Sequence, residues 1–138
     1  MPEEIRRIEY WYAVVPDKPG EGARILSALS QTGVNLLALS GFPAGARKAQ
    51  IDLFPEDGKA LAAAARKAGI KLSKKKVGFL IQGDDRPGAV AETLVKLAAA
   101  DINCTSIQAA CAGAGRYGAM LWVKAPDLKK AAKVLGAA

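Results

Sequence analysis

Hydrophobic and polar positions follow the same order twice along the chain. Branched and aromatic residues fill the runs at 8–15 and 76–81, which is typical of β-strands. After each run, a short polar turn leads into a segment whose apolar residues recur with helical spacing. The two predicted helices end at Gly33 and at Asp101. Their apolar faces are expected to contain Leu26 and Leu29 in the first copy, and Val90, Leu94 and Leu97 in the second.

The remaining pattern completes one fold in each copy. Further strands are predicted at 36–42 and 48–54, then at 104–110 and 117–123, and second helices at 57–69 and 126–136. The order β-α-β-β-α-β predicts an α+β, ferredoxin-like unit whose antiparallel sheet carries both helices on one face. The first copy adds a short strand at 70–73. The second copy ends too early for this strand, so it either has three strands or takes an edge strand from the N-terminal residues or another chain.

A constant offset of 68 positions (85 − 17 = 68) relates the two copies. Average composition would give only about one or two identities in such a window by chance. We therefore predict two tandem domains, 1–73 and 74–138, and because units of this size bury little apolar surface alone, they should pack together. The identical pairs include Asp17/Asp85, Pro19/Pro87, Gly20/Gly88, Ala23/Ala91, Leu26/Leu94, Leu29/Leu97 and Asn35/Asn103.

Each copy carries Asp-x-Pro-Gly where its first helix begins. Pro presets a helical φ angle and Gly lets another group approach the backbone. A helix start presents unpaired N–H groups to an anion such as a carboxylate, and Gly20, Glu21 and Gly22, or Gly88, Ala89 and Val90, would supply them here. Asp can accept hydrogen bonds from an ammonium group, and Asn can bridge the two ligand groups. The same residues also suit an ordinary capped turn. The candidate ligand-binding residues are Asp17, Pro19, Gly20, Glu21, Gly22 and Asn35, with Asp85, Pro87, Gly88, Ala89, Val90 and Asn103.

This recurring motif resembles the ACT domain. The matching stretches are PDKPGEGARILSALSQTGVNLLALS and DDRPGAVAETLVKLAAADINCTSIQ, and the resemblance covers nearly the whole chain as two tandem copies. It implies a βαββαβ regulatory module that binds a small ligand, usually an amino acid, and is commonly fused to metabolic enzymes. The chain is similar to stand-alone tandem ACT proteins, and we expect it to form a homodimer and to have a metabolic enzyme as a partner. The second copy departs from the pattern by its missing last strand and by Asp101 in place of Gly.

The net charge of +7 raises a different possibility, RNA binding, because RNA-recognition motifs share the βαββαβ order. Seven basic residues and no acidic ones lie between Gly58 and Gly83, a run that more often forms a solvated face. RNA-recognition motifs also stack bases on aromatic residues of the third strand, whereas Tyr117 and Trp122 are an odd number of positions apart and should face opposite sides. We expect no nucleic-acid partner.

Residue types argue against an enzyme, a metal site or a cofactor site. The chain has no histidine, which removes the commonest general base and metal ligand. The odd spacing of Cys104 and Cys111 predicts two buried thiols on opposite faces of a strand, not a chelating pair. Residues 113–118, GAGRYG, match a dinucleotide-binding pattern but join two predicted strands, so a hairpin loop is expected.

No apolar run approaches the roughly 18 residues of a membrane span, and the first residues lack the layout of a secretory signal, so a cytoplasmic location is expected. The sequence thus favours a non-catalytic sensor that binds a small ligand, with an amino acid as the expected class. Two alternatives stay open: an RNA-binding ferredoxin-like protein, and a structural module that helps a partner enzyme to oligomerise.

Overall fold

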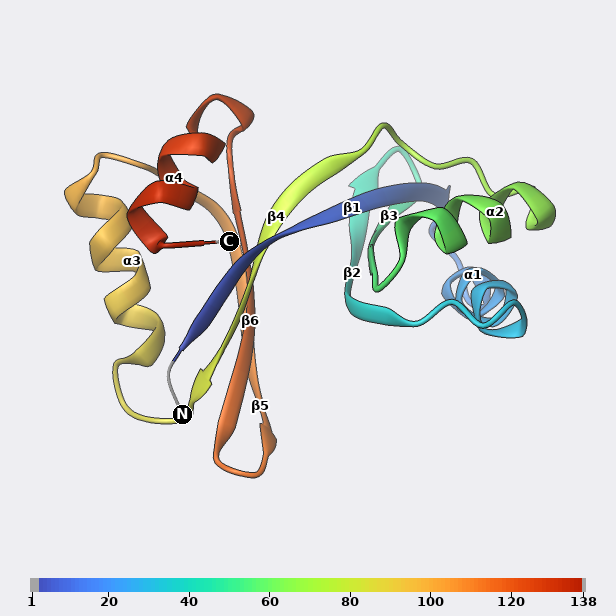
Figure 1. The fold of residues 1–138 in the computed structure, drawn as a ribbon. Coiled ribbons are helices and arrows are strands. Elements are labelled where there is room, and N and C mark those ends of the chain that lie inside the picture. Colours follow the sequence, from blue (N-terminus) through green and yellow to red (C-terminus); the bar gives the residue numbers. More distant parts are fainter. Residues whose placement is uncertain (1–2, 138) are drawn as a thin grey trace. The chain divides into compact units, whose positions relative to one another are not determined.

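The computed structural model of the chain describes residues 3–137 and contains six antiparallel strands and four α-helices (Figure 1). The predicted α+β fold is confirmed, and the order β-α-β-β-α occurs twice along the chain. The elements are β1 (Glu4–Pro16), α1 (Glu21–Gln31), β2 (Leu36–Gly45), β3 (Lys48–Pro55), α2 (Gly58–Ala68), β4 (Lys76–Asp84), α3 (Ala89–Ala99), β5 (Cys104–Gly113), β6 (Arg116–Val123) and α4 (Leu128–Leu135), with a single 3₁₀ turn (Ala125–Asp127) before α4.

Contacts divide the chain into two compact units. One unit consists of Glu9–Lys76, and the other consists of the residues from Val77 onward together with the N-terminal residues up to Ile8. Strand β1 therefore contributes its first residues to one unit and the remainder to the other. The domain limits 1–73 and 74–138 stay a prediction. The division by contacts differs from them in the place of residues 3–8 and of residues 74–76.

In the unit of Glu9–Lys76, the strand order is β2-β3-β1, and α1 and α2 cover one face of this sheet (Figure 1). Its core forms where the helical stripe of α1, with Ile25 and Leu29, meets Leu53 of β3 and Leu61 of α2. All four side chains are 0–1% exposed. The apolar spacing that predicted the first helix therefore marks the face that this helix buries.

The predicted strand at 70–73 is wrong, because this segment has no regular strand structure. The Ser73 N–H donates to the Tyr12 carbonyl oxygen at 2.9 Å, as in a ladder, but the Tyr12 N–H donates to the Ser73 side-chain oxygen, also at 2.9 Å. A hydroxyl has thus replaced a backbone acceptor, which is how serine competes with regular pairing. The segment lies along β1 without extending the sheet.

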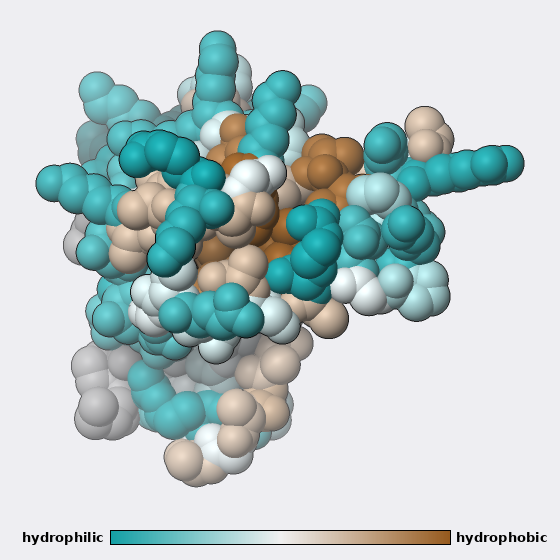
Figure 2. Space-filling view, turned by 90° about the vertical axis from the view of Figure 1, so that its right-hand side faces the viewer, coloured by the Kyte–Doolittle hydropathy of each residue, from teal (hydrophilic) through white to brown (hydrophobic). Residues whose placement is uncertain are grey.

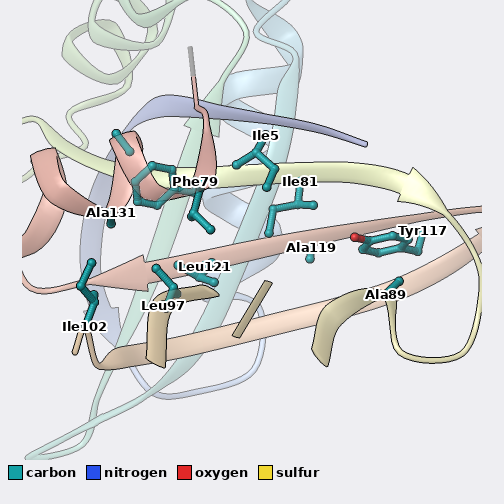
Figure 3. Packing of buried hydrophobic residues seen from close by; sticks show 12 residues of the cluster. Ile5, Phe79, Ile81, Ala89, Leu97, Ile102, Tyr117, Ala119, Leu121 and Ala131 are labelled. Carbon is teal, nitrogen blue, oxygen red and sulfur yellow. The ribbon is translucent and has the colours of Figure 1, made fainter. Parts of the chain in front are cut away.

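In the second unit, the N-terminal residues supply the edge that the second copy lacks. The strand order is β1-β4-β6-β5, and Ile5 of β1 packs in one cluster with Phe79 and Ile81 of β4 (Figure 3). The Tyr117 hydroxyl donates to the Glu3 carboxylate at 2.5 Å. Of the three alternatives left open by the sequence, the structure supports the N-terminal residues.

The basic run of α2 and the segment after it is solvated, as predicted. All seven side chains are exposed, and Lys75 forms an ion pair with Glu9 at 2.9 Å. Figure 2 shows hydrophilic side chains projecting around a hydrophobic middle on the side of the molecule where α1 and α2 lie. Within residues 3–137, none of the helices combines the length and the apolar composition that crossing a membrane requires.

The hairpin turns of the two copies are also equivalent. Gly45, Ala46 and Arg47 have positive φ angles between β2 and β3, and Gly113, Ala114 and Gly115 repeat them between β5 and β6. The GAGRYG motif is therefore a hairpin loop, as predicted, and its context excludes the dinucleotide interpretation.

Thr93 of α3 is a buried polar side chain whose hydroxyl has no hydrogen-bond partner among residues 3–137; it is 1% exposed. The first copy has Ile25 at this position (93 − 68 = 25). An unpaired buried hydroxyl costs about 1–3 kcal/mol, so Thr93→Val should raise the free energy of unfolding by about 1 kcal/mol. Urea denaturation measures the change, with Thr93→Ser as a control that keeps the hydroxyl. A lower stability of Thr93→Val than of wild type would contradict this prediction.

Asp52 of β3 is a buried carboxylate, 5% exposed, that accepts a hydrogen bond from Gln50 Nε2 at 2.9 Å. Burial raises its pKa, an effect larger than the opposing ones of Gln50 and Lys76. The folded state thus binds the Asp52 proton more tightly than the unfolded chain does. The stability that this proton contributes is complete below the unfolded-state pKa of Asp52, and it is lost as pH rises through the raised pKa of the folded state.

Asp52→Asn is therefore expected to be more stable than wild type near pH 7, and the difference should shrink on acidification to about pH 4. Denaturation at the two pH values tests this. A difference that does not depend on pH would show that ionisation of Asp52 has no part in the stability of the fold.

Candidate functional site

A hollow of about 330 Å³ lies in the first unit where β1 ends and α1 begins, beside the far end of β2. The Asp17 N–H donates to the Arg47 carbonyl oxygen at 2.9 Å. This hydrogen bond joins the Asp-x-Pro-Gly turn to the hairpin turn between β2 and β3. The volume falls in the range of small-molecule sites, about 300–1,000 Å³. We call it the first hollow; it is lined by Val15, Pro16, Asp17, Lys18, Glu21, Gly22, Gly41, Phe42, Pro43, Ala49 and Ile51.

The second unit has a hollow of about 410 Å³ at the equivalent place. The Asp85 N–H donates to the Gly115 carbonyl oxygen at 2.9 Å, and adding 68 to Asp17 and Arg47 gives these two residues. The same addition converts eight of the eleven residues of the first hollow into residues of this second hollow. The second hollow is lined by Asp85, Arg86, Gly88, Ala89, Val90, Ala91, Ala109, Ala110, Cys111 and Tyr117.

Both hollows include a helix start with free backbone donors. Gly20 and Gly88 precede α1 and α3 with φ angles of 93° and 82°, a left-handed conformation that favours glycine, and neither helix has a side-chain cap. In each helix, two first-turn N–H groups have no acceptor among residues 3–137; these belong to Gly22 and Ala23 in α1, and to Val90 and Ala91 in α3. Unpaired donors at the positive end of a helix attract an anion.

The predicted donors need a correction. The Glu21 N–H already donates to the Lys18 carbonyl oxygen at 3.4 Å, and the Ala89 N–H donates to the Arg86 carbonyl oxygen at 3.3 Å. The turn that precedes each helix therefore satisfies the first helical N–H, which leaves the second and third N–H groups for a ligand. Pro19 and Pro87 lie within these turns as predicted from their preset φ angle, and neither lines a hollow.

The structure does not bring Asn35 or Asn103 to the hollows. Asn35 lies at the opposite end of β2, where Leu36 pairs with Pro55, and its side-chain N–H group donates to the Glu56 carboxylate at 2.9 Å. Asn103 likewise precedes the end of β5 that pairs with Val123, far along the strand from the turn at Gly113. The strand after a helix begins where that helix ends, so these residues lie away from the helix start. The idea that Asn bridges the two ligand groups is therefore not supported.

Charged groups surround each Asp. Asp17 and Lys18 line the first hollow, where Glu21 pairs with Arg24 at 3.1 Å. In the second hollow, Arg86 donates two hydrogen bonds to Glu92 at 2.9 and 2.6 Å. That contact raises the pKa of Arg86 and lowers the pKa of Glu92, and it holds the guanidinium in one place.

Cys111 and Tyr117 were not predicted to belong to a site. The expectation of two buried thiols is wrong, since Cys104 is half-buried and Cys111 is exposed in the second hollow. A hydrogen bond to Asp85 raises the pKa of the Cys111 thiol. Burial, followed by the contact with Glu3, raises the pKa of the Tyr117 hydroxyl. No group of three or more His, Cys, Asp or Glu side chains in the described part of the chain is placed to hold a metal ion.

No protein-family model matches the sequence, and no curated protein matches it. Solved structures do match. Protein BT0572 from Bacteroides thetaiotaomicron is 17% identical, with a TM-score of 0.81 over 96% of this chain and 88% of that chain. The ligand-free regulatory subunit of aspartate kinase from Thermus thermophilus is 15% identical, with a TM-score of 0.65 over 98% and 93%.

The regulatory subunit of aspartate kinase from Thermus flavus matches with 15% identity and a TM-score of 0.59, over 98% of this chain and 94% of that chain. These likenesses confirm the fold expected from the repeated motif. The likeness extends over almost the whole length of both chains, and it therefore covers both copies of the repeat.

Proposed function

We propose, on the premise of this ACT fold, that the chain is a non-catalytic regulatory protein that binds a small ligand, an amino acid, in the Asp-x-Pro-Gly hollows. One observation carries the proposal: the same hollow occurs in both copies, built by residues that the offset of 68 relates. A turn needed only for folding does not require an open hollow beside it, whereas a duplicated ligand site does.

The chemistry of the first hollow suits a free amino acid, which presents a carboxylate and an ammonium group on one carbon. The carboxylate would accept hydrogen bonds from the N–H groups of Gly22 and Ala23, at the positive end of α1. The ammonium group would donate to the Asp17 carboxylate. Gly22 has no atom within 4 Å of a β-carbon built on it, so the ligand can approach the backbone there.

Regulation would follow from differential affinity. A ligand that binds one arrangement of the protein better than another shifts the population toward that arrangement. We propose that the arrangements differ in a homodimer or in a complex with a metabolic enzyme, in the cytoplasm. The matched aspartate kinase structures are regulatory subunits, which supports a role of this kind.

The RNA-binding alternative loses support from burial. Bases stack on exposed aromatic faces, but Tyr117 is 6% exposed and Trp122 is 8% exposed. These two residues were the aromatic candidates of the third strand in the second copy. Neither of these two rings therefore offers the stacking surface that such a module needs.

Calorimetric titration of the protein with each proteinogenic amino acid tests the proposal. At least one should bind saturably, and Asp17→Ala should weaken that binding about tenfold or more because the ammonium group loses a charged acceptor. Asp101→Asn is the matched control, since Asp101 is an exposed acid outside both hollows and Asn tolerates its φ of 57°. The proposal would be refuted if none of the amino acids gave a binding signal and the protein bound RNA tightly and in a salt-sensitive way.

A further inference from the structure

The two hollows differ by an exchange of size between paired residues. Val15 of β1 pairs with Ala49 of β3 in the first unit, and both line the first hollow. The equivalent pair in the second unit is Gly83 of β4 and Tyr117 of β6 (15 + 68 = 83; 49 + 68 = 117). In the first unit the larger residue of the pair lies on the first strand of the copy, whereas in the second unit it lies on the third strand. The larger residue of the second pair is Tyr117, whose aromatic ring lines the second hollow.

Two contacts fix this ring. A β-carbon built on Gly83 would lie 2.8 Å from Tyr117 Cε1, so only glycine leaves room for the ring above it. At the other end, the Tyr117 hydroxyl donates to Glu3 at 2.5 Å. The ring is labelled in Figure 3 together with Ala89, another residue of the second hollow. Tyr117 is therefore a rigid wall and not a mobile side chain.

The other differences make the second hollow more apolar near the helix start. Ala89 replaces the charged Glu21, and Val90 replaces Gly22, so an aliphatic surface borders the free N–H groups. On β5, Ala110 takes the position that Phe42 has in the first hollow. The smaller side chain leaves space on the solvent-exposed side of the second hollow, which we call its outer wall. The ionic groups that line the second hollow are Asp85 and Arg86, and Arg86 is held by Glu92.

We propose that the second hollow selects an amino acid with an aliphatic side chain, and that Tyr117, fixed by Gly83 and Glu3, sets the size of the side chain it accepts. The proposal rests on the proposed function, since it assumes that amino acids bind in the hollows. Asp85 and the N–H groups of Val90 and Ala91 would hold the charged end of the ligand. The apolar side chain would lie between Val90, Ala110 and the Tyr117 ring. A positively charged side chain would have no acidic partner there, because Asp85, the acidic residue that lines the second hollow, would already bind the ammonium group.

The test uses Gly22→Leu protein, in which a leucine fills the first hollow, so that titration reports on the second hollow. Valine or isoleucine should bind at least about tenfold more tightly than phenylalanine or lysine, a discrimination within reach of an apolar pocket. The double variant Gly83→Val/Tyr117→Ala, made in this background, copies the residue pair of the first hollow. Removing the Tyr117 ring, the inner wall of the second hollow, should reduce the preference for valine or isoleucine over phenylalanine at least about fivefold.

Two further variants keep the result decisive. Ala110→Phe copies the first hollow at an exposed strand position, so it should fold, and it should weaken valine and isoleucine binding by filling the outer wall. Ser106→Phe, in the same background, is the control: it adds the same ring at an exposed position of β5 outside the second hollow and should leave the preference unchanged. The inference is overturned if amino acids bind without an aliphatic preference, or if the preference survives both changes to the second hollow. If wild-type protein binds no amino acid at all, the proposed function itself fails.

Discussion

Ile5→Ala should lower the free energy of unfolding of the second unit by about 2–4 kcal/mol, the usual cost of truncating a large core residue to alanine. Ile5 is 9% exposed and packs with Phe79 and Ile81, although more than 70 residues separate it from them in sequence. The large effect follows from the role of the N-terminal residues as the missing edge of the second copy. Urea denaturation followed by Trp122 and Trp11 fluorescence measures it.

Arg7→Ala is the control for this prediction, because Arg7 lies on the same strand with an exposed side chain. An exposed substitution of this kind is expected to change stability by no more than about 0.5 kcal/mol. Equal and small effects of Ile5→Ala and Arg7→Ala would mean that the N-terminal residues do not belong to the second core in solution.

Gly22→Leu should abolish ligand binding in the first hollow without harming the fold. No atom lies within 4 Å of a β-carbon at Gly22, and leucine favours a helix over glycine by roughly 0.5–1 kcal/mol, so the melting temperature should hold or rise. The side chain would occupy the hollow and cover the N–H groups that seat a carboxylate. We expect at least about a hundredfold loss of affinity, the scale of a lost group of charge-assisted hydrogen bonds, by calorimetry.

Ser27→Leu is the matched control for Gly22→Leu. Ser27 is exposed on the same helix, and it is not among the residues of the first hollow. This variant adds the same side chain to α1 and should bind the ligand as wild type does. If Gly22→Leu leaves both the affinity and the number of binding sites as in wild type, the ligand does not approach the start of α1.

The repeat made the fold predictable, but it concealed which residues complete each copy. A constant offset fixes the element order because both copies must satisfy the same pattern of strands and helices. The run of β-forming residues at 8–15 gives no sign that the strand extends back to Glu4 or that its first residues join the other copy. The first residues of β1 belong to the second unit because Ile5 packs against Phe79 and Ile81. A contact between residues so far apart in sequence cannot be predicted from a local pattern.

The site was predictable only in part, and for a similar reason. Asp-x-Pro-Gly located the turn, its glycine and the helix start, because those features are local. The structure does not bring Asn35 to the first hollow, since its repetition at the offset reflects a shared position in the fold and not a position near Asp17. The exchange of Val15 and Ala49 for Gly83 and Tyr117 was visible in the aligned copies, yet its meaning needed the strand register that pairs them.

The most direct measurement is a titration of isotope-labelled protein with the amino acid that calorimetry selects, followed by the backbone N–H signals in two-dimensional NMR spectra. The account predicts that the signals of Gly22 and Ala23, or of Val90 and Ala91, shift saturably and more than those elsewhere in the chain. Large shifts confined to other regions, such as the basic segment after α2, with these four signals unchanged, would contradict it.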